Sequence, residues 1–123
     1  MEQFIVDFVV DYFKTKTTKR KQINNQQLDS LMQESLGTNA FGDGGIRALI
    51  HYLRVNIVIT NAQGDKGWIS ASSDGYYLTY NPTDILAHLE QFEGKIRKMR
   101  RVHSKGMEIL MEKIYYKQAE MQF

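Results

Sequence analysis

The sequence predicts an α+β fold of mainly helical content that ends in a long helix. Apolar residues recur at helical spacing in three segments of residues 1–56, and the turn Ser73-Asp74-Gly75 joins two short segments of strand-forming residues. Another helical pattern begins at Asn81. We therefore expect a compact domain over residues 1–80 and a helical extension over residues 81–120.

A basic loop separates the first two predicted helices. The apolar spacing predicts a helix over residues 3–14, and its expected buried residues are Phe4, Ile5, Phe8, Val9 and Tyr12. A second helix begins at Asn24, which with Gln27 has the spacing of a capping box, and ends at Gly37, where glycine tolerates a left-handed conformation. The loop is either solvated or contacts phosphates. Its candidate contact residues are Lys16, Lys19, Arg20 and Lys21.

The third predicted helix has one apolar and one polar face. We expect Asp43 to cap it and the helix to cover about Gly44 to Asn56. At about 100° per residue, its inner face holds Ile46, Leu49, Ile50 and Leu53. Its outer face holds Arg47, His51 and Arg54. An outward Arg at a groove-facing position pairs with guanine, although any surface helix also has a solvated polar face.

Strands are expected after the third helix. A short β-branched segment over residues 57–60 and a loop to Gly67 precede strands over residues 68–72 and 76–80. Asp-Gly is a strong hairpin signal. Side-chain alternation places Tyr77 on the opposite face from its neighbours, so Tyr77 is the best candidate for an exposed aromatic residue.

The final helix carries an apolar seam at alternating spacings of four and three residues. Pro82 occupies its first position, where proline is well tolerated. The seam consists of Ile85, Leu89, Phe92, Ile96 and Met99. This spacing favours dimerisation, whereas packing on the helix over residues 3–14 is the alternative. The pattern slips near Gly106, so the helix either changes register or breaks there.

Charge is unevenly distributed along the chain. Residues 1–94 carry eight Lys and Arg against eleven Asp and Glu, a net charge of −3, whereas residues 95–123 carry eight against three, a net charge of +5. The basic cluster between Lys95 and Lys105 flanks the apolar seam. We interpret it as a solvated flank, with phosphate contact as the alternative.

Several function classes are excluded on composition and spacing. The chain has no cysteine, and His51, His88 and His103 are too dispersed for a metal motif. No catalytic constellation or phosphate-binding loop is recognisable, so we expect no enzyme activity, metal or cofactor. No apolar run approaches the roughly 20 residues that span a bilayer, and the first residues are acidic, unlike a signal peptide. We expect a soluble cytoplasmic protein that does not bind membranes.

The order of predicted elements matches a winged helix-turn-helix with a C-terminal extension. In detail, IRALIHYLR and ISASSDGYYLTYNPTDILAHLEQFEGKIRKM resemble small winged-helix proteins encoded by bacteriophages. The resemblance covers roughly residues 20–105. It implies that the helix over residues 44–56 is the recognition helix and that residues 72–75 form the wing tip. Because the loop over residues 60–67 is long and Ser73-Asp74 is not basic, either hairpin is a candidate for the wing.

These features predict a protein that binds double-stranded DNA in transcriptional regulation or DNA replication, in the host cell cytoplasm if it is phage-encoded. Its candidate DNA-binding residues are Lys16, Lys19, Arg20, Lys21, Arg47, His51, Arg54 and Tyr77. The competing hypothesis is a non-enzymatic interaction module. It would bind a host or phage protein through its acidic body or its C-terminal helix.

Overall fold

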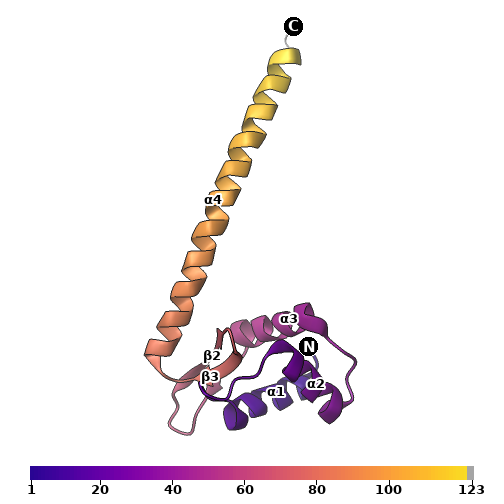
Figure 1. Cartoon of the computed structure of the whole chain (residues 1–123), viewed down its shortest axis with the longest axis vertical. Coiled ribbons are helices and arrows are strands. Elements are labelled where there is room, and N and C mark those ends of the chain that lie inside the picture. The colour runs from indigo at the N-terminus through magenta and orange to yellow at the C-terminus, as the bar shows by residue number, and fades with distance from the viewer. Residues whose placement is uncertain (122–123) are drawn as a thin grey trace. The chain divides into compact units, whose positions relative to one another are not determined.

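The structure is a computed structural model that describes the backbone of residues 1–121 and the side chains of residues 1–118. Its elements in chain order are α1 (Gln3–Lys16), α2 (Asn25–Leu36), α3 (Gly42–Asn56), β1 (Ile59–Thr60), β2 (Lys66–Ser72), β3 (Gly75–Thr79) and α4 (Pro82–Met121) (Figure 1). Helices make up 66% of the chain and the strands form an antiparallel sheet, which confirms the α+β class with mainly helical content. The chain divides into two compact units, residues 1–88 and the remainder of α4 from Leu89.

The core of the first unit lies between the first three helices and the sheet. Helix α2 packs on α3, α1 packs on β3, and α3 packs on β2. The largest side chains that are completely buried are Phe13, Leu28, Met32, Ile46, Leu49, Ile50, Leu53 and Ile69. Burial of these apolar surfaces is the main contribution to the stability of the unit.

The buried face of helix α1 is shifted from the one expected. Ile5 and Val9 are buried as expected, and Val6 and Phe13 are buried with them. Of the other expected residues, Phe8 and Tyr12 are half-buried and Phe4 is 51% exposed. Apolar residues surround most of this helix, so two neighbouring stripes satisfy the same helical spacing. The sequence pattern identified the helix, but packing against the other elements selected the stripe.

The sheet extends beyond the three strands through a residue that lies between α1 and α2. The strand order is β1-β2-β3, with antiparallel pairing throughout. The N–H of Ile23 donates to the carbonyl of Tyr76 at 3.0 Å, and the N–H of Tyr76 donates back at 2.8 Å. Gly75 allows this close approach, because a Cβ atom there would lie 2.5 Å from the backbone of Ile23. The segment before α2 is therefore fixed to the free edge of β3.

The predicted caps of α2 are confirmed. The Asn24 side chain accepts a hydrogen bond from the Gln27 N–H at 2.8 Å, and the Gln27 side chain accepts one from the Asn24 N–H at 3.0 Å. Gly37 ends the helix with φ of 67°, the left-handed conformation that glycine adopts without strain. The reciprocal bonds satisfy N–H groups that the first turn of a helix leaves without partners.

The cap of α3 differs from the expected one. The helix begins at Gly42, and Asp43 lies within its first turn instead of capping it. The carboxylate of Asp29, a buried residue of α2, accepts hydrogen bonds from the N–H groups of Phe41 at 2.9 Å and Gly42 at 3.0 Å. The Phe41 N–H holds the pKa of Asp29 below its usual value, although burial opposes this effect. A side chain of α2 therefore fixes the start of α3.

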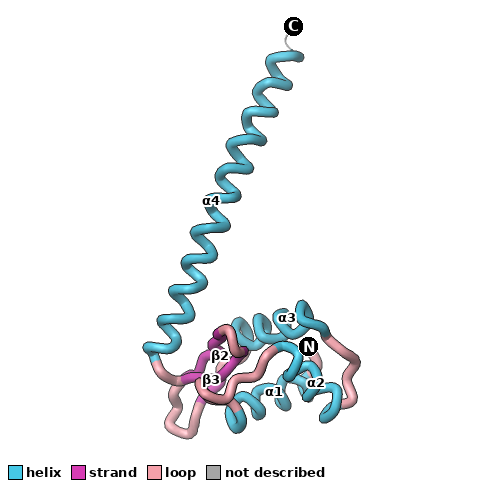
Figure 2. Tube along the Cα trace, viewed as in Figure 1, coloured by secondary structure: helices cyan, strands magenta, loops and turns pink. Residues whose placement is uncertain are grey.

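Helix α4 continues without a break through Gly106 (Figure 2). Its first turn is capped by Asn81, whose side-chain oxygen accepts a hydrogen bond from the Thr83 N–H at 2.9 Å. The Thr79 hydroxyl donates to Asp84 at 3.2 Å, and the Trp68 indole N–H donates to His88 Nδ1 at 2.9 Å. These bonds join the beginning of α4 to the sheet within the first unit.

The Asp29→Asn substitution tests the joint between α2 and α3. The folded-state pKa of Asp29 is lowered, so its carboxylate stabilises the fold above the unfolded-state pKa of about 3.9 and loses this contribution as pH falls through the lower folded-state pKa. We expect the variant to melt at a lower temperature than wild type at pH 7 and to lose less stability between about pH 5 and pH 2. Circular dichroism melts at several pH values measure both effects.

The exposed Asp11→Asn variant is the control for this substitution. Removing the Asp11 charge leaves the start of α3 intact, so its melting curve at pH 7 should match that of wild type. An Asp29→Asn variant with the wild-type melting temperature and acid sensitivity would contradict the capping role of Asp29.

Candidate nucleic-acid interface

The exposed face of α3 presents two of the three predicted base-reading residues. Arg47 and His51 are exposed and lie one helical turn apart on the same face, as expected. The inner residues Ile46, Leu49, Ile50 and Leu53 are all buried. Helix α3 thus has a firmly packed inner face and an outer face on which Arg47 and His51 are available to a ligand.

Arg54, the third predicted reader, lies partly buried against the hairpin. Its Nε–H donates to the carbonyl of Ile69 in β2 at 2.8 Å. Its guanidinium carbon lies 5.5 Å from the ring centre of Trp68 and 6.0 Å from that of Tyr76. Burial lowers the pKa of Arg54. The expectation that Arg54 projects freely outward is wrong, because the hairpin covers the side of the last turn of α3 on which it lies.

Tyr77 is buried, with 6% of its surface exposed, so the expectation of an exposed aromatic residue is wrong. The alternation itself is correct, since Tyr77 pairs with Ser70 and shares a face with Thr79. Both of these neighbours are also buried. The sheet face that carries Tyr77 is covered instead of solvated, and Thr79 on that face bonds to Asp84 of α4.

The basic loop between α1 and α2 forms a tight turn. Backbone hydrogen bonds between Thr18 and Lys21, at 3.0 and 3.1 Å, place Lys19 and Arg20 at its tip. The Lys19 ammonium lies 2.9 Å from the Asp84 carboxylate, which raises the pKa of Lys19 and lowers that of Asp84. Lys16, which was predicted in the loop but is the last residue of α1, is exposed, as are Arg20 and Lys21. None of the three has an ion pair among the described side chains.

Neither hairpin tip is basic. The β2–β3 turn is held against the segment that precedes α2, since the Ser72 hydroxyl donates to the Gln22 side chain at 2.6 Å. The β1–β2 loop is closed by Asn61, whose side-chain oxygen accepts hydrogen bonds from the N–H groups of Gln63 and Asp65. Lys66, the first residue of β2, is exposed next to that loop.

The predicted seam of α4 is mostly exposed. Ile85 and Phe92 are half-buried, and Leu89, Ile96 and Met99 are 41%, 46% and 70% exposed. The ammonium of Lys95 lies 5.9 Å from the ring centre of Phe92, within cation–π range. Further exposed apolar residues follow along the helix, including Val102, Met107, Leu110, Met111 and Ile114.

No cluster of three or more potential metal ligands occurs among the described residues. In the described part of the chain, no helix combines the length and apolar character required to cross a bilayer. Comparisons of the chain with protein-family models, with curated proteins and with solved structures give no match. The resemblance to bacteriophage winged-helix proteins therefore stays a prediction.

Two structural residues of this region had no sequence signal. Asp29 follows Leu28 within the second helix and looks like an ordinary surface carboxylate, yet it caps α3. Trp68 begins a predicted strand, and nothing in the sequence indicates its hydrogen bond to His88, which spans 20 positions. Local spacing carries no information on such pairs.

The Arg54→Ala substitution should destabilise the first unit by about 1–3 kcal/mol, because it removes a charged hydrogen-bond donor and its ring contacts. Urea denaturation followed by circular dichroism measures this change. The control is Arg47→Ala on the exposed face of the same helix, which should stay within about 0.5 kcal/mol of wild type. Equal stabilities for the two variants would contradict the structural role of Arg54.

Proposed function

We propose that this chain is a winged helix-turn-helix protein that binds double-stranded DNA through the exposed face of α3. The supporting observation is the arrangement around that helix. Asp29 ties α2 to the start of α3, the β2–β3 hairpin follows, and Ile23 pairs with β3. This combination of helix pair, hairpin and paired edge segment is typical of winged helices, in which the second helix of the pair enters the major groove.

The proposed mechanism separates base reading from backbone contact. Arg47 and His51 reach base edges, and Arg47 is suited to the paired acceptors of guanine. Lys16, Arg20 and Lys21 contact phosphates and supply affinity that does not depend on sequence. Lys19 contributes less, since Asp84 already neutralises it. Arg54 supports α3 against the hairpin without contacting DNA.

We further propose that the seam of α4 joins two copies of the chain. Exposed seam residues such as Ile96 and Met99 would form a contiguous apolar patch, which soluble monomers usually avoid. A two-fold dimer would bury this patch and present two copies of α3 to paired half-sites. The role suggested by the phage resemblance is transcriptional regulation or DNA replication in the cytoplasm of a host cell.

The competing function is a protein-interaction module. The net charge of −3 over residues 1–94 favours it, since this part of the chain attracts DNA only through local patches. In that case the helix pair is a scaffold, and a host or phage protein binds the acidic body or α4. The two functions differ in whether duplex DNA is bound at low salt.

We expect the full chain to bind a mixed-sequence duplex at about 50 mM salt, with affinity that falls steeply as salt rises. If four to six phosphates are contacted, log affinity should fall against log salt with a slope of about −4 to −5. Arg47→Ala should cost about 1–3 kcal/mol on a preferred sequence and relax specificity there. Fluorescence anisotropy on labelled duplexes measures both quantities.

The control is Leu49→Ala, on the buried face of α3. It should lower the free energy of unfolding by about 2–5 kcal/mol, whereas Arg47→Ala should leave it nearly unchanged. Absence of DNA binding at 50 mM salt would favour the interaction module. Unchanged specificity in an Arg47→Ala, His51→Ala double variant would remove α3 from the recognition role.

Self-association should be visible as a dimeric mass by light scattering after size exclusion. The Phe92→Glu, Ile96→Glu pair should give a monomer that keeps its helical circular dichroism signal. The matched control is Gln91→Glu with Ile109→Glu, which adds the same charge outside the seam, at positions about 100° from Phe92 and about 140° from Ile96 around α4, and should stay dimeric. A monomeric wild type at high protein concentration would refute the dimer.

A further inference from the structure

Helix α4 contains a segment in which every charged side chain is basic. Between Glu93 and Glu108 the chain has six basic residues and no acidic residue. At a rise of about 1.5 Å per residue, the segment from Lys95 to Lys105 spans about 15 Å of helix. All six basic side chains are exposed: Lys95, Arg97, Lys98, Arg100, Arg101 and Lys105.

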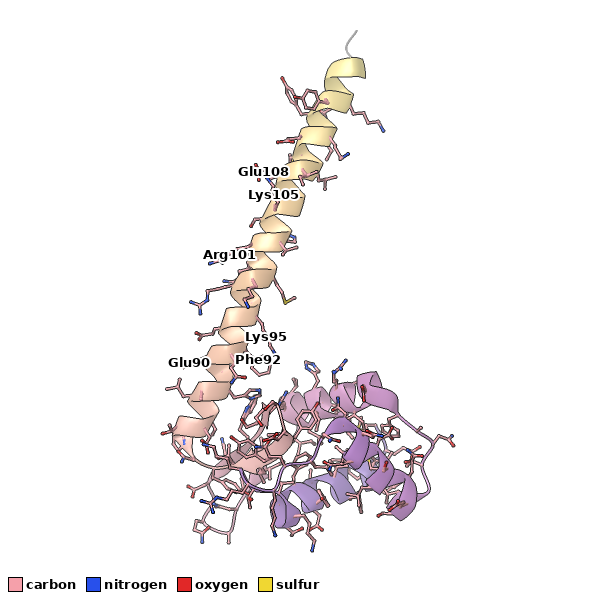
Figure 3. The ribbon with its side chains drawn as sticks, in the orientation of Figure 1. Glu90, Phe92, Lys95, Arg101, Lys105 and Glu108 are labelled. Atoms are coloured by element: carbon pink, nitrogen blue, oxygen red, sulfur yellow. The ribbon has the colours of Figure 1, made fainter. Side chains whose placement is uncertain are left out.

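Four of these residues lie on the side of the helix that faces away from the seam. At about 100° per residue, Arg101 lies about 180° from Phe92 and about 140° from Ile96. Figure 3 shows Arg101 projecting from the opposite side of α4 to Phe92 and Lys95. We name this surface the α4 basic stripe, and it consists of Arg97, Lys98, Arg101 and Lys105.

The α4 basic stripe differs from an ordinary solvated helix flank. Such flanks usually alternate charge sign, so that residues four positions apart attract one another. Here Arg97, Arg101 and Lys105 follow one another at that spacing with like charges, which destabilises the free helix. Lys105 lies 3.4 Å from Glu108, and such a solvent-exposed pair has little strength. The other three residues have no ion pair among the described side chains.

We propose that the α4 basic stripe is a second DNA-contacting surface, which binds the phosphate backbone of duplex DNA without reading its sequence. This inference rests on the proposed function and adds a site outside the first unit. A dense row of phosphates neutralises like charges along the whole stripe, and Arg binds phosphate with paired hydrogen bonds. Because the seam lies on the opposite side, self-association leaves the stripe exposed.

The composition of the stripe favours DNA over an acidic protein as its partner. Protein interfaces have an apolar core and are depleted in charge there. On the arc of α4 that runs from Arg97 through Arg101 to Lys98, Gly94 is the only uncharged residue between Glu90 and Glu108. Ser104 borders this arc beside Arg97, and the exposed Val102 lies about 40° beyond Lys98. The arc therefore offers charge and hydrogen-bond donors but no apolar core around which a protein could dock.

The test is the Arg97→Gln, Arg101→Gln variant of the full chain, titrated with a mixed-sequence duplex at several salt concentrations. If two phosphate contacts are lost, the salt slope should become shallower by about 1.8, and affinity at about 50 mM salt should fall roughly tenfold or more. The loss should be equal on unrelated duplexes. Glutamine is a good helix former, so helical signal and oligomeric mass should be unchanged.

The matched control is Lys113→Gln with Lys117→Gln, which removes the same charge from the same helix outside the stripe. It should keep nearly the wild-type slope. A wild-type slope in the stripe variant overturns the inference, and so does an equal loss in the control, which would reflect net charge alone. Displacement of DNA by polyglutamate as efficiently as by unlabelled duplex would overturn it in favour of an acidic protein partner.

The outcomes also separate this inference from the proposed function. If the wild-type chain binds no duplex, both fail. If Arg47→Ala, His51→Ala weakens binding and the stripe variant does not, only the stripe is refuted. If the stripe variant alone weakens binding, DNA binding stands and the recognition role of α3 is refuted.

Discussion

The carboxylate of Asp29 holds together the part of the molecule on which the proposed function depends. It projects from α2 and accepts hydrogen bonds from the first N–H groups of α3, where the helix dipole favours negative charge. This contact fixes the direction in which α3 leaves the turn. Once that direction is set, Ile46, Leu49, Ile50 and Leu53 enter the core, and Arg47 and His51 remain outside.

A second chain of contacts extends from α3 through the sheet to the start of α4. Arg54 donates to the backbone of β2 and lies over Trp68, and Trp68 donates to His88. Each link satisfies a polar group that would be costly to bury alone. The basic side chain nearest the end of α3 therefore has a structural role, and the exposed face of α3 carries fewer positive charges than its sequence suggests.

The two long faces of α4 have opposite chemistry. One face is apolar and includes the exposed residues Ile96 and Met99, whereas the other carries several positive charges, including those of Arg97 and Arg101. Each face is energetically unfavourable in a helix without a partner. The first exposes apolar area to water, and the like charges of the second repel one another. A second copy of the chain and an anionic backbone would satisfy them independently, since the two faces lie on opposite sides of the helix.

The sequence alone determined the features that depend on neighbouring residues. The repeated helical patterns predicted the helix-rich class correctly. The capping box of Asn24 and Gln27, the left-handed Gly37 and the hairpin turn that ends at Gly75 each require only a few consecutive residues. Side-chain alternation in β3 and the two-faced pattern of α3 were also correct. Local backbone chemistry is sufficient for such features.

Tertiary structure decided everything that depends on which surface covers another. Packing determined which apolar stripe of α1 is buried, and it covered Tyr77 on the sheet. Arg54 hydrogen-bonds to the hairpin instead of projecting outward, and Asp29 caps α3 in place of Asp43. Periodicity fixes the angle at which a side chain leaves its helix or strand, but not what lies opposite it. The hydrogen-bond partners of Arg54 and Asp29 lie 12 to 15 positions away in the sequence, so only the assembled fold brings them together.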